Sequence, residues 1–186
     1  MRMPYPWGLL SYTHLQMKKL ITEEQIKKRL KELGAEITTD YRGTVPVFIG
    51  VLKGVLFFLP DLLRNINLTM ELDFVVISFY HGKRKPRMLI LEREIETDIK
   101  DRHVILVDDI LDTGNTLDLL IDNVNRKGAK DISICVLLQK EKEREVNITP
   151  AYVGFKIPDK FVIGYGLDFE ERFRNLPFIG VLEENS

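Results

Sequence analysis

A cluster of three aspartates lies near the middle of the chain. Asp108 and Asp109 are adjacent, and Asp112 follows after two apolar residues. Neighbouring carboxylates can accept hydrogen bonds from sugar hydroxyls, or hold a divalent cation through oxygen ligands. A small polar loop that opens a helix binds phosphate through hydroxyls and unpaired backbone N–H groups. The residues after Asp112 are Thr113, Gly114, Asn115 and Thr116, so the stretch predicts a site for a phosphorylated sugar.

The flanking sequence predicts the elements that position these residues. The continuous apolar run 104–107 is typical of a parallel strand buried on both faces. Residues 117–127 have helical spacing and stop before Gly128. Ligands of open α/β sheets bind outside the carboxyl ends of the strands, where the aspartates are expected. The segment lacks the P-loop and Gly-x-Gly-x-x-Gly patterns, which argues against both kinds of site. The alternative is an acidic turn that only caps the helix.

Two further apolar runs, 45–52 and 131–138, predict buried strands that end beside basic residues. Lys53 and Gly54 follow the first run, and Lys140 follows the second. A lysine and a glycine that open a helix form an anion site, although a solvated loop lysine is the alternative for Lys53. Because carboxyl ends of parallel strands meet at one edge of the sheet, we expect these residues near the aspartates.

Helical patterns in the first third of the chain predict scaffold elements. Thr22 begins a capping box for a helix over 23–33, which Gly34 is expected to end. A second, apolar helix is expected over 54–65, with a kink or break at Pro60 because proline has no N–H to donate.

Composition restricts the class of protein. The 186 residues are 45% hydrophobic and 30% charged, with a net charge of −1, which predicts one folded domain and gives no basic excess for nucleic acid. No apolar run has the length of a membrane span. The single cysteine, Cys135, lies in an apolar run and is expected to be a buried thiol, which favours a reducing cytoplasm.

The segment 104–116 resembles the phosphoribosyl diphosphate (PRPP) signature of the type I phosphoribosyltransferases, including the acid pair and Asp-Thr-Gly. Asp112 is similar to the acid of the 6-oxopurine branch, and 154–168 resembles the family's hood. The resemblance implies an α/β fold with a doubly wound, mainly parallel sheet, a small C-terminal hood and a mobile antiparallel loop. It implies transfer of the 5-phosphoribosyl group from PRPP to hypoxanthine or guanine in purine salvage, giving IMP or GMP and diphosphate.

The resemblance also implies roles for residues of the PRPP site. Asp108 and Asp109 would hold the ribose hydroxyls, and the loop 112–116 would hold the 5′-phosphate. Asp112 would accept a proton from the purine ring. The helix N-terminus is expected to lower the basicity of Asp112, and closure of the loop 80–88 to offset this. The implied diphosphate contacts are Lys53, Gly54, Tyr80 and Arg174.

The implied base pocket lies in the C-terminal part of the chain. Lys140 would hydrogen-bond the purine O6, because an ammonium only donates and mismatches the 6-amino group of adenine. Phe161 would stack on the base, typically worth about 1–3 kcal/mol, unless it is a core strand residue. The backbone of Val162 would read the edge of the base. Asp168 would bind the Mg²⁺ that carries the diphosphate, with Asp108 and Asp109 as metal ligands only through ribose or water.

A basic loop, 81–87, is predicted between two antiparallel strands, 71–80 and 88–93. In the family such a loop closes over the site, with a Ser-Tyr pair near its start. Tyr80 matches the tyrosine, but Phe79 stands in place of the serine. A second implied feature is a cis peptide between residues 52 and 53.

Residues 1–16 are expected to be an N-terminal extension, and 17–186 a single domain with its hood largely from 150–186. The family forms homodimers and homotetramers, and the apolar helix over 54–65 is a candidate contact surface. Two other classes remain open: a PRPP-binding regulator of RNA or DNA, and an interaction protein with a decayed site. The net charge of −1 and the presence of Asp112 argue against a regulator, and few residues depart from the pattern.

Overall fold

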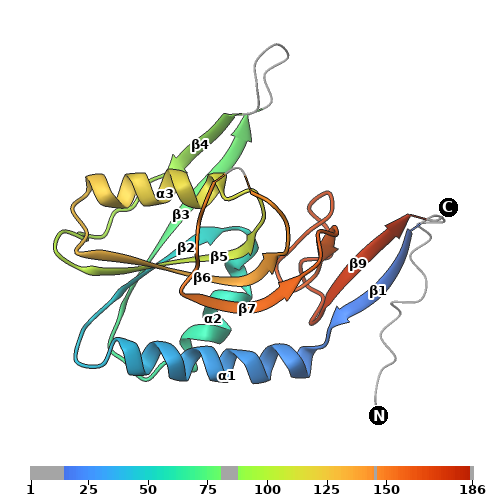
Figure 1. Ribbon diagram of the computed structural model, residues 1–186, viewed down its shortest axis with the longest axis horizontal. Coiled ribbons are helices and arrows are strands. Elements are labelled where there is room, and N and C mark those ends of the chain that lie inside the picture. Colours follow the sequence, from blue (N-terminus) through green and yellow to red (C-terminus); the bar gives the residue numbers. More distant parts are fainter. Residues whose placement is uncertain (1–14, 81–87, 145, 185–186) are drawn as a thin grey trace.

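A six-stranded sheet forms the body of the protein in a computed structural model that describes residues 15–80, 88–144 and 146–184 (Figure 1). The strand order is β4-β3-β2-β5-β6-β7, and only the β3–β4 pair is antiparallel. The strands are β2 (Val47–Leu52), β3 (Glu71–Tyr80), β4 (Met88–Arg93), β5 (His103–Leu111), β6 (Asp131–Lys140) and β7 (Tyr152–Ile157).

Helices cover both faces of this sheet. Helices α1 (Glu23–Asp40) and α2 (Phe58–Leu63) lie on one face, with the 3₁₀ turn η1 (Gly54–Leu56) before α2, and α3 (Asn115–Arg126) lies on the other (Figure 1). Two apolar clusters fill the two layers, because the central strands are buried on both faces and need cover on each. The predicted doubly wound, mainly parallel sheet is confirmed.

A second, three-stranded sheet stands beside the body. Its order is β1 (Leu15–Ile21), β9 (Ile179–Glu184) and β8 (Val162–Ile163), with antiparallel pairing throughout. The strands of this sheet differ from those of the expected hood in two ways. Strand β7 pairs with β6 and belongs to the body, and β1 comes from the other end of the chain. Because β1 begins at Leu15, the boundary predicted after residue 16 falls inside a strand; residues 1–14 lie outside the described residues.

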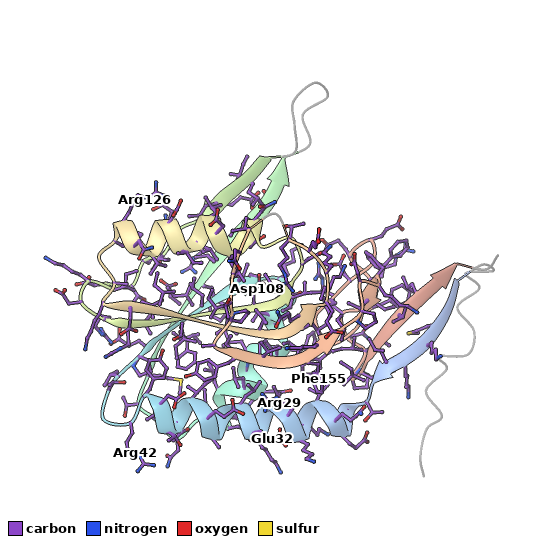
Figure 2. All side chains as sticks on the ribbon, in the orientation of Figure 1. Arg29, Glu32, Arg42, Asp108, Arg126 and Phe155 are labelled. Carbon is purple, nitrogen blue, oxygen red and sulfur yellow. The ribbon has the colours of Figure 1, made fainter. Side chains whose placement is uncertain are left out.

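Helix α1 is longer than predicted. Its capping box at Thr22 is present, but the helix continues through Gly34 to Asp40. The prediction that Gly34 ends the helix was wrong, because the glycine serves packing: a Cβ there would lie 2.4 Å from the Asn65 carbonyl oxygen. On another face of α1, the Arg29 guanidinium donates to the Val153 carbonyl of β7 at 2.9 Å (Figure 2).

The expected apolar helix over 54–65 is interrupted at Phe57, not at Pro60. Pro60 lies in the first turn of α2, where backbone N–H groups have no partner within the helix, so the proline costs little. The peptide between Leu52 and Lys53 is cis. Cys135 is buried in the body, as predicted.

Candidate active site

A cavity of about 930 Å³ opens at the carboxyl ends of β2 and β5. Ligands of doubly wound sheets bind at this edge. Its polar lining comes from the predicted phosphate and ribose residues, and its apolar lining from β2, β3, β4, β5, the first turn of α3 and Phe161. The predicted site residues that line it are Gly54, Asp108, Asp109, Asp112, Thr113, Gly114, Asn115, Thr116 and Phe161.

The two adjacent aspartates lie within β5, which runs four residues past the predicted strand end at 107. Asp108 is buried inside the molecule (Figure 2), and its carboxylate accepts the Asp109 N–H at 3.0 Å. Burial and the adjacent Asp109 carboxyl raise the pKa of Asp108 well above its ordinary value, and burial also raises the pKa of Asp109. A ligand that supplies hydrogen-bond donors or a cation would stabilise the ionised form of these two carboxyls.

The predicted phosphate loop opens α3. Gly114 is the residue before the helix, with φ +92°, a left-handed conformation that glycine adopts without strain. The helix begins at Asn115, two residues earlier than predicted, so the residues of the loop and the first turn surround the cavity together. The twelve-residue helix directs the positive end of its dipole toward this space, which favours an anion.

The predicted diphosphate loop meets the aspartate pair and the C-terminal segment at two glycines. A Cβ on Gly54 would lie 1.7 Å from an Asp109 carboxylate oxygen. A Cβ on Gly166, where φ is +106°, would lie 2.0 Å from the Gly54 carbonyl oxygen. Both positions therefore require glycine for close approach, and the contact ties the turn after β2 to the segment after β8.

An alternating chain of ion pairs links Lys53 to the C-terminal segment. The Lys53 ammonium lies 3.1 Å from Glu171, whose carboxylate lies 3.2 Å from Arg174, and Arg174 contacts Asp168 at 2.7 Å. Hydrogen bonds from Lys53 and then Arg174 lower the pKa of Glu171. Glu171 was not predicted as a partner of Lys53, because the two residues lie 118 positions apart in the chain.

The segment around these residues has an unusual backbone. Four residues other than glycine have positive φ values there: Tyr165 (51°), Glu170 (51°), Glu171 (62°) and Phe173 (72°). Such conformations are costly and concentrate at ligand-binding segments. The Arg174 guanidinium donates to the Gly166 carbonyl at 2.7 Å, which holds the segment in this shape.

Asp112 and Lys140 form the centre of a charged cluster. Lys140 is buried, and its ammonium lies 3.1 Å from Asp112 and 3.0 Å from Asp159. The Lys142 ammonium also contacts Asp112. Burial alone would raise the pKa of Asp112, but hydrogen bonds from Lys142 and Lys140 outweigh burial and hold that pKa below its usual value. The expected lowering of the Asp112 pKa is therefore present, and two lysines that were not part of the expectation contribute to it.

The contacts of Lys142 and Asp159 were not predicted. Lys142 lies in the charged run 141–147, whose composition is typical of a solvated surface, yet its ammonium ion-pairs with Asp112. Asp159 lies inside the segment 154–168 that resembles the family's hood, and that was the only signal for it in the sequence.

Phe161 is 53% exposed at the cavity and meets Phe169 edge-to-face, with ring centroids 5.8 Å apart. The alternative of a core strand residue is therefore wrong for Phe161. Val162, by contrast, is buried in β8, where its backbone pairs with Val181. The backbone of Tyr80 ends β3, but its side chain and that of Phe79, as well as the loop 81–87, lie outside the described residues.

This fold and cavity define an enzyme that binds a phosphorylated sugar. The chain belongs to the phosphoribosyltransferase family: the model of the phosphoribosyl transferase domain matches residues 17–170. It is 44% identical over 167 residues to the hypoxanthine-guanine phosphoribosyltransferase of Bacillus subtilis (strain 168), covering 89% of this chain and 93% of that relative. The predicted hypoxanthine phosphoribosyltransferase class is confirmed.

Solved structures agree with this assignment. A hypoxanthine phosphoribosyltransferase from Staphylococcus aureus superposes with a TM-score of 0.86 at 37% identity, covering 95% of this chain and 96% of that one. The enzyme from Trypanosoma cruzi, in complex with the product IMP, has a TM-score of 0.82 at 35% identity, covering 89% and 94%. None of the described helices is long and apolar enough to cross a membrane.

Proposed function

We propose that the protein transfers the 5-phosphoribosyl group of PRPP to hypoxanthine, and also to guanine, giving IMP or GMP and diphosphate. The observation that carries the proposal is the pairing of Lys140 and Asp112 at 3.1 Å, beside the cavity that the α3 N-terminus enters. A donor-only ammonium next to an acceptor carboxylate suits the O6 and the adjacent ring nitrogen of a 6-oxopurine. The relatives named above support the same reaction.

The residues proposed to contact the ribose and the 5′-phosphate line the cavity. The loop 112–116 and the start of α3 supply N–H groups and hydroxyls for the 5′-phosphate. Asp108 and Asp109 accept hydrogen bonds from the ribose hydroxyls, which compensates two buried carboxyls of raised pKa. Lys53, Gly54, Tyr80 and Arg174 bind the diphosphate. Lys53 and Arg174 each ion-pair with Glu171, so this carboxylate competes with the diphosphate for both cations.

The residues present fit Mg²⁺ as the cofactor. Among the described residues, no three His, Cys, Asp or Glu side chains group into a closed metal site. Mg²⁺ instead suits one or two carboxylates together with substrate oxygens and water. Asp168, whose carboxylate now pairs with Arg174 at 2.7 Å, would hold the ion, with Asp108 and Asp109 acting through ribose or water. When bound, the ion would neutralise charge on the leaving diphosphate.

Catalysis in this proposal consists of positioning and charge stabilisation. Phe161 stacks on the base and the backbone of Val162 reads its edge. Lys140 donates to O6, which orients the ring nitrogen that attacks C1 of the ribose. Asp112 accepts the proton that the purine loses as the new bond forms. We further propose a cytoplasmic homodimer or homotetramer with no nucleic-acid partner.

A PRPP-dependent assay with separate bases tests the proposal. Purified protein with PRPP and Mg²⁺ is offered hypoxanthine, guanine, xanthine or adenine, and nucleotide formation is followed by ultraviolet absorbance. We expect IMP and GMP, and no AMP, because Lys140 cannot accept from a 6-amino group. Nucleotide formation with adenine at a rate similar to that with hypoxanthine would contradict the assigned pocket.

A further inference from the structure

Four charged side chains close a ring beside the cavity. Lys140 contacts Asp112 at 3.1 Å and Asp159 at 3.0 Å. Lys142 contacts the other oxygen of Asp112 and lies 3.5 Å from the same Asp159 oxygen. Positive and negative charges alternate around the ring, so it is neutral as a whole.

The ring joins three separate segments. Asp112 belongs to the loop before α3, and the two lysines belong to the end of β6 and the residues after it. Asp159 lies between β7 and β8. The charged groups that face Asp112 among the described residues are Lys140 and Lys142, with Asp159 behind both. Arg144 donates to the Lys140 carbonyl.

Lys140 and Lys142 differ in the exposed fraction of their side chains. The Lys140 side chain is 11% exposed and the Lys142 side chain 25% exposed. An ammonium has three donors, so Lys140 can keep its carboxylate partners and still donate to a purine oxygen. Lys142 contacts the same two carboxylates as Lys140 but holds the other oxygen of Asp112.

We infer that Lys142 is a positioning residue, which keeps the Asp112 carboxylate ionised and fixed beside Lys140 while the purine enters. The inference rests on the proposed function, since it presumes that Asp112 accepts the purine proton. Asp159 also ion-pairs with both lysines, which weakens their attraction for the Asp112 carboxylate.

We expect substitutions of Lys142 and Asp159 to shift the pKa of Asp112 in opposite directions. Hydrogen bonds from Lys142 and Lys140 lower the pKa of Asp112. Removing the Lys142 charge should therefore raise that pKa, by about one pH unit for a cation in direct contact. Removing the Asp159 charge should lower it, because both lysines would then turn to Asp112. A purely structural role of Lys142 and Asp159 would not shift the pKa of Asp112 in opposite directions in the two variants.

Carboxyl titration by NMR tests the ring in the whole, ligand-free protein. Aspartate labelled with ¹³C at the carboxyl carbon is introduced, and the Asp112 resonance is assigned by its loss in Asp112→Asn. We expect the titration midpoint to rise by about one pH unit in Lys142→Met and to fall in Asp159→Asn. Lys142→Arg, which restores the charge, should return the wild-type midpoint, and Lys31→Met, at an exposed position of α1, should leave it unchanged.

The pH profile of kcat/KM for hypoxanthine at saturating PRPP tests the consequence for the reaction. The acid limb should move up by about one pH unit in Lys142→Met and stay in place in Lys31→Met. A Lys142→Met midpoint equal to wild type in the NMR titration overturns the inference, even with an active enzyme. A shifted midpoint with an unshifted acid limb also overturns it and removes Asp112 as proton acceptor. Wild-type protein without PRPP-dependent activity contradicts the proposed function alone.

Discussion

Asp112 is the residue on which the proposed chemistry depends most directly. In Asp112→Asn we expect turnover to fall by about 100-fold, because an amide cannot accept the purine proton and general-base catalysis typically contributes about 10²–10⁴-fold. The KM for PRPP should change little, since the backbone N–H groups of the loop 112–116 remain. Steady-state kinetics with hypoxanthine and PRPP measure both values. Equal turnover in wild type and variant would show that another group takes the proton.

The positions of single residues at the site were predictable only where they belong to a motif. The acids of β5, Lys140 and Phe161 lie at the cavity or beside it, as their positions in the chain predicted. Glu171 and Lys142 were not predicted, although each contacts a predicted residue. An ion pair depends on how two distant segments approach and on which rotamer each side chain adopts, and neither leaves a periodic signal in the sequence.

Elements were predictable where periodicity is strong and less so at their ends. The apolar runs predicted β2, β5 and β6, because strands buried on both faces need uninterrupted apolar residues. The ends depend on tertiary contacts. Helix α1 passes through Gly34, since the glycine admits the Asn65 backbone and Ile37 beyond it is fully buried. A local rule for helix ends cannot detect a neighbour that lies far along the chain.

Asp73 anchors the turn after β4 to β3, and its charge should make this connection sensitive to pH. The buried carboxylate accepts the N–H groups of Phe74 (2.7 Å), Glu96 (2.8 Å) and Thr97 (2.9 Å). Burial alone would raise its pKa, but these N–H groups, together with Arg93, hold the pKa below its ordinary value. The carboxylate therefore stabilises the fold above the unfolded-state pKa of about 3.9, and this contribution is lost as the pH falls through the lower, folded-state pKa.

In Asp73→Asn we expect the free energy of unfolding at pH 7 to fall by about 2 kcal/mol, since a charged acceptor is lost and an NH₂ group faces backbone donors. The difference between variant and wild type should shrink as the pH is lowered toward and below the folded-state pKa. Urea unfolding at several pH values measures this. Asp122→Asn, the same change at an exposed position of α3, should stay within about 0.5 kcal/mol of wild type at every pH. A pH-independent difference for Asp73→Asn would contradict the role of its charge.

On the scale of the whole molecule, the small sheet and the body share one apolar cluster. Ile179 of β9 and Val162 of β8 belong to the same apolar cluster as Ile26 of α1 and Phe48 of β2. The Tyr165 hydroxyl donates to the Asp61 carboxylate of α2 at 2.6 Å, which adds a polar link. The residues proposed to bind the base and the diphosphate therefore rest on the core that supports the proposed phosphate loop. We therefore expect the part of the cavity formed by the body and the part near the small sheet to keep the same relative position.

This shared core predicts that damage to the small sheet destabilises the entire protein. In Ile179→Ala, at a fully buried position, we expect a loss of about 3 kcal/mol in the free energy of global unfolding, from lost burial and a residual cavity. Leu72→Ala removes an aliphatic side chain that is 43% exposed and should cost much less. Native-state hydrogen exchange reports both sheets at once. Protection should fall equally for the β9 and β5 amides, because they open in one cooperative unit. Loss of protection confined to β1, β8 and β9 would instead identify the small sheet as an independently unfolding cover over the cavity.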